Sequence, residues 1–186
     1  LGPHSSALPT PSGCFIDRRT AMSDLRERLE SGSRLVNITG PSGSGKTRLA
    51  HQWAEQFEKS GHGEVALINL KHAADDTDLQ LAAGTKLGLS LSHDLDGSLA
   101  ERVGHAVASR GRLVIILDDF PKTLDPSVLS TWLHAAPDTR LLVTSLDPLN
   151  SSQATQLQLG PMNIDHAVSL FLARTHRSLR GKDRPT

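Results

Sequence analysis

The sequence predicts an α/β fold: a parallel, five-stranded sheet with helices on both of its faces. β-rich runs alternate with segments of helical periodicity, one of these runs is apolar throughout, and a glycine-rich segment joins the first run to a helix. A chain of 186 residues has room for one compact domain. We expect this domain to occupy residues 14–160, after a flexible lead-in of residues 1–13 that is rich in proline, serine and glycine.

The expected strands are short, and residues 113–117 (LVIIL) are continuously apolar, which is typical of a central strand buried on both faces. The five runs are residues 34–39, 64–70, 113–117, 140–144 and 155–159. Helices are expected where apolar residues recur every three or four positions, in residues 20–30, 46–57, 79–87, 99–107, 126–133 and 163–171. We expect Asp125 to cap the fifth helix, with Pro126 at its first position, and Asn163 to cap the sixth.

The segment between the first strand and its helix carries the clearest functional signal. It matches the pattern of a glycine, four residues of any kind, a second glycine, a lysine, and then serine or threonine. The matching residues are Gly40, Pro41, Ser42, Gly43, Ser44, Gly45, Lys46 and Thr47. Glycines let successive backbone N–H groups curl around phosphates, and the following helix adds the partial positive charge of its N-terminus. Lys46 would reach the β- and γ-phosphates of a nucleotide, and the Thr47 hydroxyl would bind Mg²⁺. The sequence therefore predicts a P-loop NTPase.

Two carboxylates follow the apolar third strand directly. Asp118 and Asp119 would lie at the carboxyl edge of the sheet, where the phosphate loop also begins. Mg²⁺ on a nucleotide needs hard oxygen ligands, and an attacking water needs an orienting carboxylate. We assign Asp118 to the magnesium shell, and Asp119, with Lys46, to catalysis.

Composition disfavours other classes of function. Twenty Lys plus Arg balance twenty Asp plus Glu and aromatic residues make up 3%, so we do not expect this domain to bind nucleic acid. No apolar run is long enough to span a membrane, and the single cysteine, Cys14, fits a reducing compartment, so we expect a cytoplasmic protein. The histidines lack the spacing of metal ligands and are expected to be solvated or to cap helices.

The order of these segments resembles the nucleotide-binding, NB-ARC-like domain of the STAND signal-transduction ATPases, relatives of AAA+ proteins, in their bacterial regulator branch. Phe15-Ile16-Asp17-Arg18 stands where that family has an aromatic or aliphatic pair followed by Gly-Arg, and residues 140–145 (RLLVTS) resemble its sensor strand. Residues 157–174 (LQLGPMNIDHAVSLFLAR) resemble the strand, proline and helix that lead into the family's lid. The resemblance implies the strand order 5-1-4-3-2, and makes residues 161–186 the first lid helix and a truncated tail.

The resemblance also implies a set of nucleotide contacts. Phe15, Ile16 and Arg18 would lie near the adenine, Pro161 would approach from the lid side, and the sensor strand would bring Thr144 and Ser145 to the nucleotide. Leu146 stands where the family commonly has an arginine. From its place next to the loop, Arg48 is a further candidate for phosphate contact.

We expect an ATP- and ADP-binding switch domain that hydrolyses slowly with Mg²⁺, because Asp119 is one methylene shorter than the glutamate that many ATPases use. By the resemblance, the full-length protein would self-associate in its ATP state and would carry a complete lid, a winged helix and sensor repeats. Two alternatives stay open. One is a P-loop small-molecule kinase with its acceptor site in residues 71–97; the other is a non-hydrolysing, nucleotide-gated interaction module, which Leu146 would fit.

Overall fold

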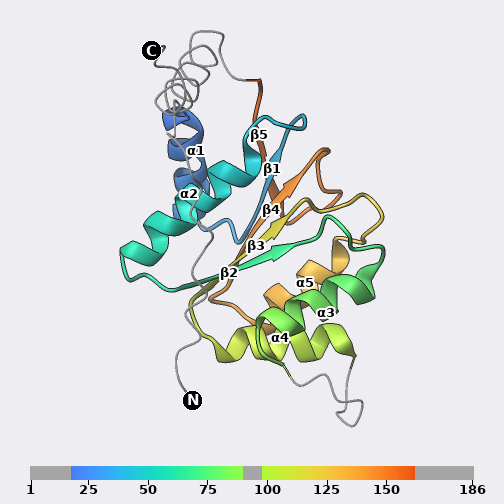
Figure 1. Ribbon diagram of the computed structural model, residues 1–186. Coiled ribbons are helices and arrows are strands. Elements are labelled where there is room, and N and C mark those ends of the chain that lie inside the picture. The colour runs from blue at the N-terminus through green and yellow to red at the C-terminus, as the bar shows by residue number, and fades with distance from the viewer. Residues whose placement is uncertain (1–17, 90–97, 162–186) are drawn as a thin grey trace, which may run out of the picture.

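A computed structural model describes residues 18–89 and 98–161. Its core is one parallel sheet of five strands in the order β2-β3-β4-β1-β5, which confirms the predicted architecture and strand order (Figure 1). The strands are β1 (Leu35–Thr39), β2 (Glu64–Asn69), β3 (Leu113–Asp118), β4 (Arg140–Ser145) and β5 (Ala154–Gln158). Each lies within one residue of its expected bounds, because β-branched and leucine runs in this chain are sharply bounded by glycine, proline and charge.

Helices cover both faces of the sheet (Figure 1). α1 (Arg19–Glu30) and α2 (Lys46–Lys59) pack on one face, and α3 (Asp76–Lys86), α4 (Leu99–Ser109) and α5 (Ser127–Ala135) pack on the other. Alternate residues of β3 serve the two faces: Val114 and Ile116 join the cluster under α1 and α2, while Ile115 and Leu117 join the cluster under α3, α4 and α5. This division explains why residues 113–117 of the third strand are apolar at every position.

Helix starts differ from the expected ones by a few residues. α3 begins at Asp76, earlier than its apolar pattern indicates, because the Asp75 carboxylate accepts a hydrogen bond from the N–H of Asp78 at 3.0 Å and caps the helix. α5 begins at Ser127, and Pro126 is its N-cap residue, so the expectation that Asp125 is the cap and Pro126 the first helical residue is wrong by one position; the N–H of Ser127 donates to Asp125 at 2.9 Å. The expected lead-in and the expected helix after Asn163 lie outside the described residues. In the part of the chain that is described, no helix is long and apolar enough to cross a membrane.

The parallel sheet brings the predicted site residues to one edge. Asp118 ends β3, Thr144 and Ser145 end β4, and the glycine-rich loop leaves the end of β1. β4 lies between β1 and β3, with Ile38 opposite Thr144 in the pairing with β1. The carboxyl edge of the sheet therefore collects the loop, the carboxylate and the sensor residues in neighbouring positions.

Candidate functional site

The glycine-rich loop has a backbone that only glycine adopts readily. Gly40, Gly43 and Gly45 have φ values of 150°, 77° and 92°. A Cβ added to Gly40 would lie 2.2 Å from the carbonyl oxygen of Leu159, at the end of β5. Leu159 in turn donates its N–H to the carbonyl of Thr39 at 2.7 Å. The loop is thus held tightly against the sheet edge at its first glycine.

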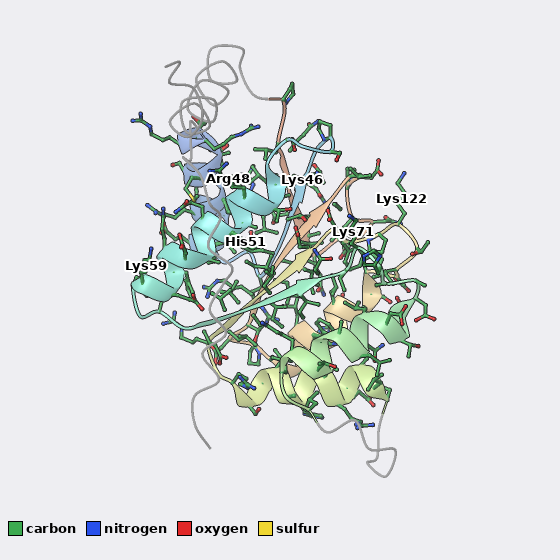
Figure 2. All side chains as sticks on the ribbon, in the orientation of Figure 1. Lys46, Arg48, His51, Lys59, Lys71 and Lys122 are labelled. Atoms are coloured by element: carbon green, nitrogen blue, oxygen red, sulfur yellow. The ribbon has the colours of Figure 1, made fainter. Side chains whose placement is uncertain are left out.

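Lys46 is a buried cation beside the glycine-rich loop. Its side chain is 7% exposed and its Nζ donates to the carbonyls of Gly40 at 2.9 Å and Pro41 at 3.1 Å. Among the described residues it forms no ion pair. The hydroxyl of Ser44, also in the loop, is buried and has no hydrogen-bond partner in the same part of the chain. A buried ammonium group is costly unless it is paired, so the loop is suited to bind an anion. Figure 2 shows Lys46 at the end of α2 that adjoins the loop.

The carboxylate at the end of β3 is fixed by two hydroxyls. Asp118 is 5% exposed, and its Oδ1 accepts hydrogen bonds from Thr47 Oγ1 at 2.7 Å and from Thr144 Oγ1 at 2.6 Å. Thr47 belongs to the helix that follows the loop, and Thr144 belongs to the neighbouring strand β4. Three elements therefore bring oxygen atoms together beside the loop, which is the donor type that Mg²⁺ prefers.

The protein groups at this edge that could bind a metal ion are few. In the described residues there is no group of three or more His, Cys, Asp or Glu side chains that could hold a metal ion. Thr47 and Asp118 are hard oxygen ligands and fit Mg²⁺ that takes its other ligands from phosphate and water, as this ion commonly does. The unpartnered Ser44 hydroxyl and the unpaired Lys46 fit the phosphate part of such a ligand.

Asp119 directly follows β3 at the carboxyl edge of the sheet and is exposed. With φ of 56°, it is the one residue other than glycine with positive φ in the described chain. Its N–H donates to Thr144 Oγ1 at 3.0 Å, and the next residue, Phe120, donates its N–H to the Thr144 carbonyl at 2.8 Å. Thr144 thus orients both carboxylate residues: it donates to the first and accepts from the backbone of the second.

Arg18 connects the loop with the end of the sheet. Its Nη2 donates to the carbonyls of Ser44 at 2.7 Å and Gly160 at 3.0 Å. Pro161, which follows Gly160, is exposed. The structure therefore places Arg18 and Pro161 next to the loop region, while Phe15 and Ile16 lie outside the described residues.

The remaining candidates are less closely joined to the loop. Ser145 is buried, and its Oγ lies 2.9 Å from Asn37 Oδ1 and 2.6 Å from the carbonyl oxygen of Asp147. Its hydroxyl is therefore within hydrogen-bond distance of other protein groups, one in β1 and one just after β4. Arg48 is half-buried on α2, two residues after Lys46 (Figure 2). Leu146, which follows the sensor strand, is 63% exposed.

Sequence reasoning missed His51, which was expected to be solvated or capping. The structure contradicts this: His51 is 7% exposed, and its Nε2 has no hydrogen-bond partner in the described chain. Burial lowers the pKa of the imidazole below its usual 6.5, although the negative charges of Asp118 and Glu55 act in the opposite direction. The helical spacing could have indicated this, since His51 lies one helical turn after Thr47 and therefore on the same face of α2. Figure 2 shows His51 on this helix.

The strand order, the loop after β1 and the carboxylate at the end of β3 define a P-loop NTPase. The chain belongs to the AAA domain family, which matches residues 27–159. It is therefore an AAA-type nucleotide-binding domain.

Individual relatives are more distant. An uncharacterized protein of Mycobacterium tuberculosis is 28% identical over 166 residues, which are 88% of this chain and 41% of the relative. A putative HTH-type transcriptional regulator of the same organism is 29% identical over 154 residues, 80% of this chain and 17% of the regulator. Among solved structures, Cdc6p from Pyrobaculum aerophilum has a TM-score of 0.69 at 17% identity, over 93% of this chain and 52% of that one. The chain thus spans less than half the length of these curated relatives.

Proposed function

We propose that this domain is an ATP- and ADP-binding, slowly hydrolysing switch in a larger regulatory protein of the STAND type. The observation that carries the proposal is the hydrogen bond of 2.7 Å between Thr47 and Asp118, next to the buried and unpaired Lys46. An anion site and a set of hard oxygen ligands at one edge of the sheet are what a magnesium nucleotide requires.

Each part of the site has a distinct task in this proposal. Backbone N–H groups of residues 40–47 and the Lys46 ammonium group would hold the phosphates, and Thr47 and Asp118 would hold Mg²⁺. The bound metal would neutralise charge on the phosphates. Asp119 would orient the attacking water. Residues near the adenine would include Phe15, Ile16, Arg18 and Pro161, on the resemblance to STAND proteins.

Slow turnover follows from the position of Asp119. Its side chain is short and exposed, and among the described residues no side chain donates a hydrogen bond to its carboxylate. A loosely held base raises the barrier, because a displacement of about 1 Å can reduce a rate on the order of 100-fold. A switch tolerates this, since its output depends on which nucleotide is bound more than on the rate of hydrolysis.

The regulatory context rests on the relatives. The chain covers 17% of a protein described as a putative HTH-type transcriptional regulator, so a domain of this kind is found within a longer regulator. By the resemblance to STAND ATPases, we propose that the complete protein adds a lid, a winged helix and sensor repeats, and that it self-associates in the ATP state.

A second candidate is a nucleotide-gated module that does not hydrolyse. It is favoured by Leu146, which is 63% exposed at the position where STAND proteins commonly have an arginine. The two candidates differ only in turnover. They share the nucleotide site and the expected dependence on Mg²⁺.

The first experiment is calorimetric titration of the folded protein with ATP and with ADP, each with Mg²⁺. We expect both to bind; absence of binding would overturn both candidates. The second is a single-turnover ATPase assay of the wild type and Asp119→Asn. A slow rate that falls in the variant supports the switch, whereas equal rates at the level of the reaction in solution support the non-hydrolysing module.

A further inference from the structure

A cavity lies at the edge of the sheet opposite to the phosphate loop. It has a volume of about 400 Å³ and is formed by the second halves of α1 and α2, the turn after α2 and the residues that begin β3 and β4. Its apolar lining consists of the side chains of Leu29, Trp53 and Phe57. The rings of Trp53 and Phe57 are stacked, with centroids 5.2 Å apart. A cavity of this size and character suits a small organic ligand.

The charged side chains that line this cavity are predominantly cationic. Three guanidinium groups, those of Arg26, Arg112 and Arg140, border it together with a single carboxylate, Glu30. Within the described residues none of the three arginines forms an ion pair, and Arg26 donates to the side-chain oxygen of Gln56 at 3.1 Å. The C-terminal ends of α1 and α2 offset part of this charge by about half a unit each. A net positive charge remains beside the apolar wall.

We propose that this cavity binds a planar aromatic anion, such as an aromatic carboxylate, sulfonate or phosphate. The apolar wall would take the ring, and the guanidinium groups would bind the anionic group, for which their planar N–H donors are well suited. The backbones of Arg112 and Arg140 belong to the strands that these residues precede or begin, so two of the three arginines enter the cavity lining from the amino edge of the sheet. This site is separate from the phosphate loop, and the proposal does not depend on nucleotide binding.

Trp53 provides a direct reporter of occupancy. The chain contains two tryptophans, and Trp132 is fully buried in the cluster on the other face of the sheet. In a Trp132→Phe background the emission comes from Trp53 alone. We expect naphthalene-1-sulfonate to change this emission saturably. The neutral naphthalene-1-sulfonamide and the aliphatic methanesulfonate are expected to bind much more weakly, because each lacks one of the two required features.

The charge contribution is tested with the double variant Arg112→Gln/Arg140→Gln. Both side chains are at least partly exposed, so the fold is expected to persist, which thermal unfolding by circular dichroism verifies. The affinity for naphthalene-1-sulfonate should fall about tenfold, as two partly solvated ionic contacts are lost. The matched control is Lys71→Gln/Lys122→Gln, which removes the same charge from surface positions outside the cavity lining (Figure 2).

Three results would overturn the proposal. They are no saturable response of Trp53, equal affinity of the sulfonate and the sulfonamide, and equal affinity of the wild type and the arginine variant.

Lys46→Ala separates the two sites. It should leave sulfonate binding unchanged, and a parallel loss of sulfonate binding would also overturn the proposal, because it would show that the probe binds at the phosphate loop instead.

Discussion

The carboxyl and amino edges of the sheet are made by the same elements, α2, β3 and β4, but they hold polar groups in different ways. At the carboxyl edge Asp118 is buried and accepts hydrogen bonds from Thr47 and Thr144. At the amino edge, Arg112 and Arg140 reach solvent and form no ion pair in the described chain. The first arrangement is preorganised, as a site for a metal and phosphates requires. The second suits a ligand that binds weakly and exchanges.

The largest expected effect comes from glycines that lie against the backbone at each edge. A Cβ at Gly40 would lie 2.2 Å from the Leu159 carbonyl oxygen, and a Cβ at Gly63 would lie 2.3 Å from that of Arg112. Gly40→Ala also strains a positive φ, so we expect a loss of about 3 kcal/mol in unfolding free energy, against about 2 kcal/mol for Gly63→Ala. Urea denaturation measures both.

Nucleotide binding distinguishes these two glycine variants. Under conditions in which both are folded, Gly40→Ala should lose binding of MgADP and Gly63→Ala should keep it. Loss of binding in both would mean that the carboxyl edge is not a separate site.

Lys46→Ala should weaken ATP and ADP binding by about 10- to 100-fold, the contribution of a charged hydrogen-bonding group to a phosphate ligand. Lys59→Ala is the matched control, since Lys59 lies on the same helix but is exposed and pairs with Glu55 at 3.8 Å. Calorimetry of both variants gives the comparison. Unchanged affinity in Lys46→Ala would contradict the assignment of the phosphate site.

Two threonines of similar burial near the ends of β4 test the hydrogen bonds at the carboxyl edge. Thr144→Val removes a donor to Asp118 and an acceptor of the Asp119 N–H, so we expect a loss of about 1–2 kcal/mol in unfolding free energy. Thr139 is buried at the amino edge and its Oγ1 has no partner in the described chain, so Thr139→Val should be neutral or stabilising. Equal losses in the two variants would show that the Thr144 contacts contribute little.

The smallest expected effect is a pH dependence from His51. Burial lowers its pKa in the folded state below 6.5, so the unfolded chain binds the proton more readily. Well above pH 6.5 the histidine therefore does not lower the free energy of unfolding. It lowers this free energy as the pH falls from 6.5 toward the lower pKa of the folded state. His51→Gln should flatten this part of a stability–pH curve. A wild-type slope in this variant would exclude His51 as its source.

The fold could be predicted because the pattern is local and strong. Residues 113–117 are apolar at each position, and residues 40–47 fix a strand, a loop and a helix in one motif. The sequence also predicted Asp118 and Thr47 as magnesium ligands; that role stays a prediction, and the structure brings the two side chains within hydrogen-bond distance. Parallel strands end at a common edge, so chain order was sufficient for this prediction.

Details that depend on packing across the sheet could not be predicted. His51 is buried on α2, and Thr144 accepts a hydrogen bond from the N–H of Asp119, whose φ is positive; both features depend on tertiary packing. The amino-edge cavity combines Arg26, Arg112 and Arg140, which are far apart in the chain and share no motif. Residues 15 and 16, predicted from a resemblance alone, lie outside the described residues and stay predictions.

The central claim is that Asp118, held by Thr47, is the protein's carboxylate for the magnesium of a bound nucleotide. The most direct test is to measure ATP affinity with and without Mg²⁺ in the wild type and in Asp118→Asn, which keeps the shape of the side chain. We predict that Mg²⁺ strengthens ATP binding to the wild type and that this gain largely disappears in the variant. An equal gain from Mg²⁺ in both proteins would contradict the account.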